Sequence, residues 1–191
     1  MILDSIDWKI IKQLHLDARK SFKELGKTIG YTGLGAKKRV IKLVKQQVIQ
    51  PSVLINTEAL GFRLAFILLE IESAEAMRKM IERYKNCPRI LNFFTTLGGY
   101  NLIVLVMAED QDTLQSEAME MCSVRSCEGI RRSEFYPLNE VNMPFLPLRR
   151  YTSIKQEEIA PCGVDCKVCT SFQNQECVAC PSVKEYKGPL K

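Results

Sequence analysis

An alternation of two hydrophobic periods between residues 63 and 138 most strongly limits the folds open to this chain. Short apolar or alternating runs are typical of strands, and apolar residues recurring every three to four positions are typical of helices. Along this region the order is strand, helix, strand, strand, helix, strand. The expected segments are RLAFILLEIE (63–72), AEAMRKMIERYKN (74–86), RILNFFTTL (89–97), NLIVLVMAE (101–109), DTLQSEAMEMCS (112–123) and GIRRSEFYPL (129–138). This βαββαβ order predicts a ferredoxin-like domain in a chain of the α+β class.

Residues 1–52 predict three short helices. Ser21 and Glu24 form the S-x-x-E pattern of a capping box, so a second helix should cover about 22–29. Gly30 is a suitable stop, and Thr32 can cap a third helix that runs to about Gln46. Two helices joined by so short a turn indicate a helix-turn-helix. We expect Leu34, Val40, Leu43 and Val44 to face the core from the third helix.

The chain carries its positive charge mainly in this same segment. Residues 1–52 hold eleven Lys and Arg against four Asp and Glu, a net charge of +7, whereas the whole chain has +5 and the remainder −2. A basic helix after a tight turn is typical of a recognition helix that lies in the major groove of double-stranded DNA. The alternative is a solvated lysine face without a partner. The candidate DNA-binding residues are Thr32, Lys37, Lys38, Arg39, Lys42 and Lys45.

The N-terminal segment resembles the Lrp/AsnC family of transcription regulators, which opens with a Leu-Asp-x-x-Asp-x-x-Ile-Leu pattern. Gly33 stands where the family often has proline, and Gln47 stands where it usually has glycine. A left-handed backbone at Gln47 would cost about 1 kcal/mol. The residues that carry the resemblance are Leu3, Asp4, Asp7, Ile10, Ile11, Arg19, Glu24, Leu25, Gly30, Thr32, Arg39, Val40, Leu43, Val48 and Ile49.

The resemblance covers about residues 1–142 and implies a winged helix-turn-helix DNA-binding domain followed by a regulatory domain. In the family, sheets of the regulatory domain pair subunits into dimers and higher assemblies. The implied divisions are a DNA-binding domain (1–52), a connector (53–62), in which 53–55 is a possible strand, and a ferredoxin-like regulatory and assembly domain (63–142).

The resemblance also implies a small-molecule effector site at the turn between the second and third strands of the regulatory domain. The matching residues are Gly98, Gly99, Tyr100 and Asn101. The family favours aspartate where Asn101 stands, so this site lacks a charge that an amino-acid effector would meet. The alternative is a hairpin turn that uses two glycines because it needs positive φ angles.

Beyond a linker (143–160), five of the eight cysteines lie within twenty residues and define a cysteine-rich metal module (161–191). Their spacing is C-x3-C-x2-C-x7-C-x2-C, and thiolates at such spacing bind zinc or iron–sulfur clusters. The candidate ligands are Cys162, Cys166, Cys169, Cys177 and Cys180. Because the segment has almost no apolar core of its own, we expect metal binding to supply its folding free energy.

Two ligand sets remain open. The pairs Cys166/Cys169 and Cys177/Cys180 would make a tetrathiolate zinc knuckle, with Cys162 spare. The first three cysteines with Cys180, which precedes Pro181, form a run typical of an iron–sulfur cluster, with Cys177 spare. Thr170 and Pro181 stand where zinc knuckles tend to have glycine, which slightly favours a [4Fe-4S] cluster over Zn. Structural or disulfide cysteines are a third alternative.

The rest of the sequence narrows the function classes. The longest apolar runs, AFILL (65–69) and LIVLVMA (102–108), are far shorter than the roughly 20 residues of a membrane-spanning helix. The N-terminus has no signal-peptide pattern, so we expect a cytoplasmic protein with reduced cysteines. There is no P-loop, GxSxG or dinucleotide motif, and His15 is the sole histidine, so we expect no enzyme. Cys87, Cys122 and Cys127 are scattered and are interpreted as small apolar fillers.

These observations predict a sequence-specific, homo-oligomeric DNA-binding regulator whose cysteine module senses redox state or metal supply. One alternative is the same regulator with a structural zinc module and an amino-acid-like effector. Another is an electron-transfer or cluster-handling protein on a regulator fold, which would have no need of a basic N-terminal face.

Overall fold

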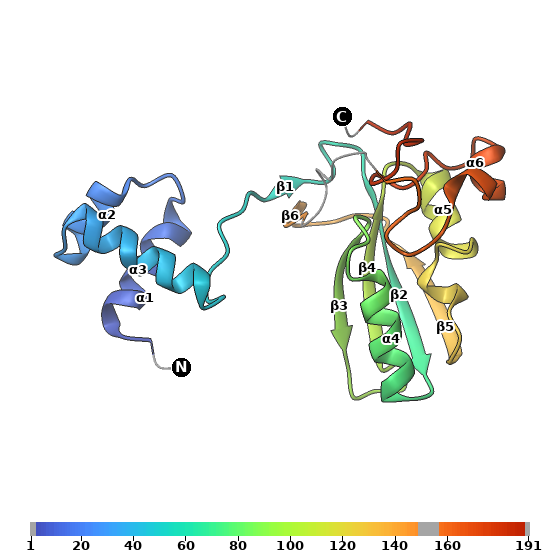
Figure 1. Ribbon diagram of the computed structural model, residues 1–191, viewed down its shortest axis with the longest axis horizontal. Helices are drawn as coiled ribbons and strands as arrows, with labels where there is room; N and C mark the ends of the chain where they lie inside the picture. The colour runs from blue at the N-terminus through green and yellow to red at the C-terminus, as the bar shows by residue number, and fades with distance from the viewer. Residues whose placement is uncertain (1–2, 149–156, 190–191) are drawn as a thin grey trace. The chain divides into compact units, whose positions relative to one another are not determined.

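The computed structural model describes residues 3–148 and 157–189. The chain divides into two compact units, Met1–Val53 and Leu54–Lys191 (Figure 1). No helix in the described ranges is long and apolar enough to cross a membrane. The first unit holds the predicted helix-turn-helix, and the second holds the sheet together with the cysteine-rich tail.

Three helices form the first unit: α1 (Ser5–Leu16), α2 (Phe22–Ile29) and α3 (Gly33–Lys45). Side chains that accept backbone N–H groups begin each helix, because the first turn of a helix lacks intrahelical acceptors. Asp4 and Asp7 form a capping box at α1, Ser21 and Glu24 form one at α2, and Thr32 caps α3. The core consists of Ile10, Leu25, Ile29, Ala36, Val40 and Leu43.

The outward face of α3 differs from the prediction. Leu34 is 64% exposed and Val44 is 36% exposed, so the expectation that both face the core is wrong. The buried stripe instead passes through Ala36, Val40 and Leu43, which are spaced by four and three residues on one side of the helix. Residues 3–53 contain no assigned strand, so the winged form of the helix-turn-helix is not found among them.

Helix α3 ends in a Schellman motif with an unusual residue. The N–H of Val48 donates to the Leu43 carbonyl at 3.0 Å, and the N–H of Gln47 donates to the Val44 carbonyl at 2.9 Å. Gln47 has φ 55°, in the left-handed region that glycine occupies without steric cost. The helix therefore stops where glycine is usual, with backbone strain stored at Gln47.

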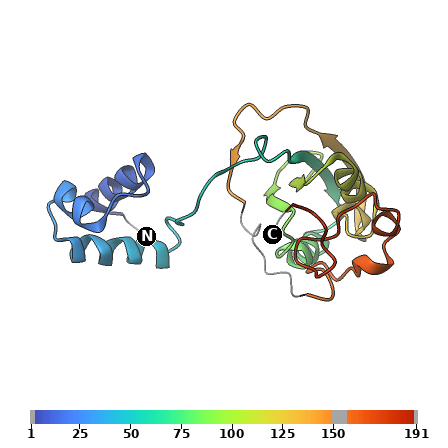
Figure 2. The ribbon, with the colours of Figure 1, turned by 90° about the horizontal axis from the view of Figure 1, so that it is seen from above.

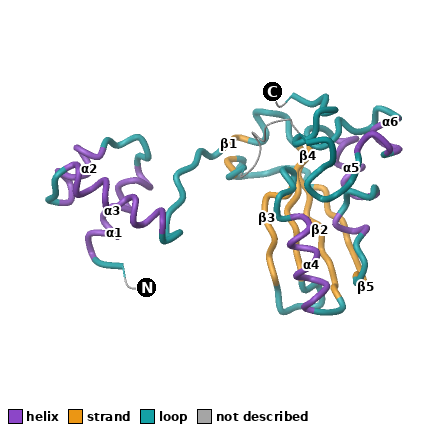
Figure 3. Tube along the Cα trace, in the orientation of Figure 1, coloured by secondary structure: helices purple, strands orange, loops and turns teal. Residues whose placement is uncertain are grey.

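The second unit contains the predicted ferredoxin-like sheet. Its strands are β2 (Arg63–Ile71), β3 (Ile90–Thr95), β4 (Leu102–Ala108) and β5 (Ile130–Pro137), in the spatial order β3-β4-β2-β5. All neighbouring strands are antiparallel. Helices α4 (Ala74–Tyr84) and α5 (Gln111–Met119) complete the βαββαβ order (Figure 3).

A second, two-stranded sheet lies at the start of this unit. Strand β1 (Ile55–Asn56) pairs antiparallel with β6 (Phe145–Leu146). The possible strand at 53–55 is thus displaced by about one residue, and the start of the predicted linker at 143–160 is partly ordered by this pairing. Residues 149–156 of that linker lie outside the described residues.

The two faces of the four-stranded sheet differ in what covers them. Alternate residues of β2 and β4, among them Ile67, Leu69, Leu102 and Val104, are buried against α4 and α5. On the opposite face, Phe66, Leu68, Ile103 and Tyr136 line an apolar hollow, and Tyr136 is 49% exposed. A sheet with one covered face and one open apolar face is suited to pairing with another surface.

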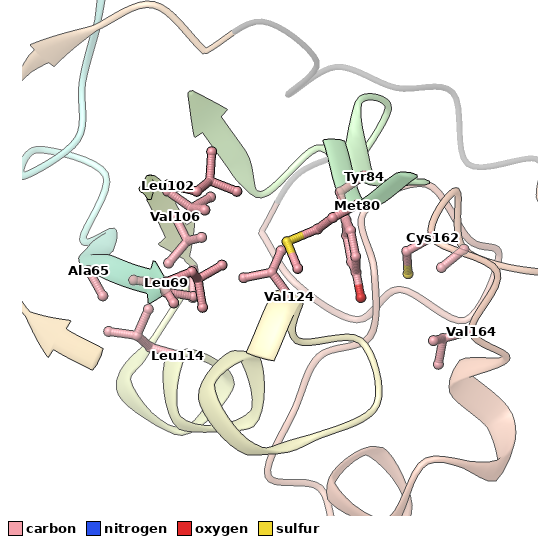
Figure 4. Packing of buried hydrophobic residues seen from close by; sticks show 14 of the residues in the cluster. Ala65, Leu69, Met80, Tyr84, Leu102, Val106, Leu114, Val124, Cys162 and Val164 are labelled. Carbon is pink, nitrogen blue, oxygen red and sulfur yellow. The ribbon is translucent and has the colours of Figure 1, made fainter. Parts of the chain in front are cut away.

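The cysteine-rich tail packs into the helical side of this domain. Cys162, Val164, Cys166, Ala179 and Val183 are buried in the same cluster as the sheet and helix residues. Figure 4 shows Cys162 and Val164 near Tyr84 and Met80 of α4, and Figure 2 shows the tail, in orange and red, folded against the domain. The tail has one 3-10 turn, η2 (Cys166–Val168), and one short helix, α6 (Thr170–Gln173). Its apolar packing is therefore supplied by the domain, which the sequence analysis did not foresee.

Candidate functional site: a basic helix and a cysteine-lined cavity

The exposed side of α3 carries four lysines. Thr32 starts the helix by accepting the N–H of Gly35 at 3.1 Å, so its hydroxyl has a structural partner. Lys37, Lys38, Lys42 and Lys45 are all exposed. Leu34 and Ile41 are also exposed, by 64% and 42%, which the sequence analysis missed because both are apolar. Lysines can neutralise phosphates, and apolar side chains beside them can contact the methyl group of thymine.

Arg39 differs from the four lysines because it has partners within the chain. Its Nη1 donates to Asp4 at 2.7 Å and to Asp7 at 2.9 Å, and its Nη2 donates to the Tyr31 hydroxyl at 3.3 Å. The guanidinium also lies over the Tyr31 ring, 5.2 Å from its centroid. The hydrogen bonds that Arg39 donates to Asp4 and Asp7 raise the pKa of Arg39, and the bond to Asp4 lowers the pKa of that carboxylate. Arg39 thus fastens α3 to the capping box of α1.

Two glycines allow α2 and the start of α3 to lie close together. A Cβ atom at Gly26 would lie 2.7 Å from the Tyr31 carbonyl oxygen, and one at Gly33 would lie 3.2 Å from the Lys23 Cα. Gly30 makes the turn between the helices with φ 75°. The position of Gly30 after the second helix makes its role predictable from the sequence, whereas Gly26 lies inside a helical pattern and has no such signal.

The predicted effector turn is held by contacts within the chain. The Asn101 side chain accepts the N–H of Ile71 at 2.8 Å and donates to the Ile71 carbonyl at 2.7 Å. The Tyr100 hydroxyl donates to Glu134, and hydrogen bonds led by that contact lower the pKa of Glu134 to about 2. Gly98 and Gly99 are exposed and neither has a positive φ, so the interpretation that the turn needs glycine for its backbone is wrong.

Seven of the eight cysteines line one cavity between the tail and the domain. Cys87, which follows α4, and Cys122, which follows α5, join the five tail cysteines there. Cys87, Cys122 and Cys127 all pack against the apolar core, as the interpretation as apolar fillers expects. The fold also brings Cys87 and Cys122 to the tail cysteines, which their distance in the sequence conceals. Cys127 is absent from the lining. The cysteines of the cavity are Cys87, Cys122, Cys162, Cys166, Cys169, Cys177 and Cys180.

The described cysteines are all free thiols. Burial opposes the charged form of a thiol. Burial raises the pKa of Cys162, Cys166 and Cys169, and it raises that of Cys180 to about 12. Across residues 3–148 and 157–189, no three Cys, His, Asp or Glu side chains converge as they would around a single ion.

A buried ion network forms one wall of this cavity. Arg89, which precedes β3, contacts Glu109 at 2.9 Å and Glu117 at 3.1 Å, and its side chain is only 4% exposed. Burial opposes the charge of Arg89, but the two carboxylates outweigh it and hold the pKa of the guanidinium above its ordinary value. Burial also raises the pKa of Glu117. Arg89 donates in addition to the carbonyl of Ala179 in the tail.

Further hydrogen bonds attach the tail to α4, α5 and β4. Arg83 donates to the carbonyl of Cys162 at 2.9 Å. The hydroxyl of Tyr186 donates to Glu109 at 2.7 Å. Ser171 donates to Glu120 at 2.7 Å. The position of the cysteine cluster is therefore set by polar contacts along its length as well as by apolar packing.

Comparison with known proteins finds family models that match both the helix-turn-helix segment and the ferredoxin-like domain. The model of the AsnC-type helix-turn-helix domain matches residues 3–44, and that of the Lrp/AsnC ligand binding domain matches residues 64–136. An uncharacterized HTH-type transcriptional regulator of Pyrococcus horikoshii, PH1055, is 30% identical over 129 residues, covering 65% of this chain and 80% of that protein. The regulatory protein AsnC of Haemophilus influenzae is 28% identical over 134 residues, covering 67% of this chain and 89% of that protein.

Solved structures share the fold over a similar range. The crystal structure of PH0061 has a TM-score of 0.66 at 21% identity and covers 76% of this chain and 99% of that chain. Escherichia coli AsnC has a TM-score of 0.63 at 21% identity and covers 75% of this chain and 96% of that chain. Both family models end before the cysteine-rich tail. The matched relatives are named as transcriptional regulators rather than enzymes. The chain belongs to the Lrp/AsnC family of transcription regulators.

Proposed function

We propose that this DNA-binding regulator is controlled by a [4Fe-4S] cluster that four of its five tail cysteines hold. The observation that carries the proposal is the shared cavity, which gathers these thiols against the helical side of the assembly domain. A tail that only needed a metal to fold would not require a place in the domain core. Here Cys162 and Cys166 are 7% and 8% exposed and belong to the cluster that contains Tyr84 and Leu114.

The residue types around the cavity fit a cluster. All five tail cysteines line it, and so do Cys87 and Cys122. Each thiolate of a [4Fe-4S] cube binds a different iron, so four of the tail cysteines are enough to hold one cluster. When bound, the cluster supplies a redox centre that responds to oxidants and to iron supply.

On DNA, we propose that α3 enters the major groove with its lysine face. Lys38, Lys42 and Lys45 project from the side of the helix opposite the buried stripe, so they can reach phosphates while the helix stays packed. Thr32 and Arg39 act differently, since Thr32 caps α3 and Arg39 anchors it to α1. Leu34 and Ile41 are exposed on the same helix as the lysines, where they can make apolar contacts with the methyl groups of thymine bases.

A dimer formed through the open face of the sheet fits this mode of binding. Phe66, Leu68, Ile103 and Tyr136 form an apolar hollow on the face that α4 and α5 leave uncovered. A dimer carries two recognition helices, and helix-turn-helix dimers bind two half-sites about 34 Å apart, one turn of DNA. Phe66→Glu should shift the protein toward monomer in sedimentation velocity, whereas Met119→Glu, on α5, should not. Equal assembly of both variants would contradict this interface.

The direct test of the cofactor is anaerobic purification followed by assay of iron, acid-labile sulfide and zinc per chain. The proposal expects a coloured protein with about four irons and four sulfides per chain. A colourless protein with one zinc per chain would support the structural zinc module instead. Substitution of Cys127, the cysteine outside the cavity, by serine is the matched control and should leave the metal content unchanged.

A second candidate function is control by a small amino-acid effector at the turn of Gly98, Gly99, Tyr100 and Asn101. The observation in its favour is a family neighbour, NMB0573 from Neisseria meningitidis, whose structure is a complex with L-Met and has a TM-score of 0.62 to this chain at 20% identity. In this chain the amide of Asn101 is paired to Ile71 and the hydroxyl of Tyr100 to Glu134. An effector would have to compete with these contacts. Calorimetry with a set of amino acids tests this candidate, with Asn101→Asp as the variant that restores the family's residue.

A further inference from the structure

Another cavity between the tail and the assembly domain is lined by carboxylates rather than by thiols. Its volume is about 480 Å³, within the range of small-molecule sites. Helix α5 supplies one wall with Asp112, Ser116 and Met119, and Glu120 follows at the end of that helix. The loop around α6 supplies the other wall with Ser171 and Glu176. The cavity therefore exists only where the tail lies against α5.

The three carboxylates of this cavity are not neutralised within the described structure. Asp112, Glu120 and Glu176 have no ion pair among residues 3–148 and 157–189, and no described Lys or Arg lines the cavity. Glu120 accepts a hydrogen bond from Ser171 at 2.7 Å, which leaves its charge uncompensated. A hollow lined by charges of one sign concentrates ligands of the opposite sign. The cavity thus favours a positively charged ligand.

The hydroxyl of Ser116 points to a ligand independently of the charges. Ser116 is 4% exposed, and its Oγ has no hydrogen-bond partner among the described residues. Because Asp112, Ser116 and Met119 are spaced by four and three residues, their side chains project from the same face of α5 toward the cavity. A buried hydroxyl without a partner costs free energy, and an N–H group of a ligand would satisfy it.

A left-handed turn after α6 fixes the tail side of the cavity. Gln175 has φ 64°, and its N–H donates to the Phe172 carbonyl at 3.1 Å. The N–H of Glu176 donates to the Ser171 carbonyl at 2.8 Å, which completes a Schellman motif. The turn reverses the chain so that Ser171 and Glu176 both reach the cavity. Backbone strain at a residue other than glycine is concentrated at functional sites.

The arrangement of these groups suits an extended cation better than a metal ion. In the described ranges, no three metal-binding side chains converge around a point. A linear polyamine carries several ammonium groups joined by short methylene chains, so it can donate to carboxylates that stand apart. Its methylene groups can pack on the side chain of Met119, which is 85% exposed.

We propose that this cavity binds a linear polyamine, with Asp112, Glu120 and Glu176 as partners of its ammonium groups and Ser116 as a further acceptor. Because α5 and the tail each supply part of the site, the ligand fastens the tail to the assembly domain. The inference goes beyond the proposed function and does not depend on which metal the tail cysteines hold. Failure of either leaves the other standing.

The test is calorimetry with spermidine on the full-length chain, purified without oxygen and kept at low salt without DNA. The double variant Asp112→Asn/Glu176→Gln keeps the size of both side chains and removes two charges. It should bind spermidine roughly four- to twenty-five-fold more weakly than wild type, from about two- to fivefold for each exposed ion pair.

The matched control is Glu128→Gln/Glu140→Gln, which makes the same charge change at two exposed carboxylates outside the cavity. It should bind spermidine like wild type. Equal affinities in the two double variants would overturn the site, because binding would then follow net charge alone or take place elsewhere. Absence of spermidine binding to wild type, or equal affinity for Mg²⁺, would overturn it as well.

Ser116→Ala separates a ligand contact from a structural role. Loss of a hydroxyl without a partner should leave the urea midpoint equal to or above that of wild type, whereas spermidine affinity should fall about two- to tenfold. Wild-type affinity in this variant would contradict the assignment of Ser116. Hydrogen exchange then locates the ligand: spermidine should slow exchange in both α5 and residues 171–176. Protection confined to other segments would overturn the shared site.

Discussion

Arg39 on α3 donates to Asp7 on α1 at 2.9 Å, and Asp7 is 4% exposed. The sequence predicts that Arg39 belongs to a basic DNA-binding face. In the structure its guanidinium instead fastens the recognition helix α3 to α1. Removing it would leave a buried carboxylate without its cation, which is costly because a charge away from water needs a partner.

We predict that Arg39→Ala destabilises the N-terminal unit by roughly 1–2 kcal/mol, the scale of a partly exposed charged hydrogen bond. The fluorescence of Trp8, the one tryptophan in the sequence, reports unfolding of this unit because Trp8 lies on α1. Urea unfolding followed at Trp8 is the measurement. An unfolding midpoint equal to that of the wild type would contradict the anchoring role.

Substitution of the exposed lysines should weaken DNA binding without lowering the stability of the N-terminal unit. Lys38→Ala and Lys42→Ala remove charges that have no ion pair in the described structure, so the Trp8 transition should stay within about 0.5 kcal/mol of wild type. Each change should weaken DNA binding and reduce the slope of log affinity against log salt by about 1. Fluorescence anisotropy across a salt series measures this slope, and an unchanged slope in both variants would reject α3 as the phosphate-contacting helix.

Gln47 offers a stabilising substitution. Gln47→Gly relieves the left-handed backbone at φ 55° and should raise stability by up to about 1 kcal/mol, after the greater freedom of glycine in the unfolded chain is subtracted. Gln46→Gly is the matched control, since Gln46 has φ −82° and gains nothing. The control should be less stable than wild type. Equal effects of the two substitutions would show that strain at Gln47 is unimportant.

Asp4 makes the N-terminal unit sensitive to acid. Its pKa lies below the ordinary 3.8, because of the hydrogen bond from Arg39 first and backbone N–H groups next. A lowered folded-state pKa stabilises the fold above the unfolded-state value and loses that contribution as pH falls through the folded-state value. The Trp8 unfolding midpoint should therefore decline below about pH 4. In Asp4→Asn this part of the decline should be missing, and an identical pH profile would contradict the linkage.

Much of the fold could be predicted because the hydrophobic periodicity and the capping residues of each helix or strand lie within that element's own sequence. Helix α2 begins and ends at the predicted residues, since Ser21, Glu24 and Gly30 are strong short-range signals. The strands of the ferredoxin-like sheet agree with the alternating runs to within about two residues. Leu34 and Val44 were misplaced because apolar character alone does not distinguish a core position from an exposed one on a short helix.

The cysteine site shows what sequence reasoning could not reach. The spacing of Cys162 to Cys180 indicates a metal site, but nothing local reveals that Cys87, Cys122 and Arg89 would form its other wall. These contacts span up to ninety residues of chain and depend on how the tail packs against α4 and α5.

The proposed function requires that the state of the cysteine site controls DNA binding. The most direct measurement compares the affinity of the cluster-loaded and cluster-free protein for one DNA, selected from a random pool by the loaded protein, at fixed salt and without oxygen. We expect at least a tenfold difference in Kd, about 1.4 kcal/mol of coupling between the tail and the recognition helix. Equal Kd values for a protein shown to gain and lose its cluster would contradict it.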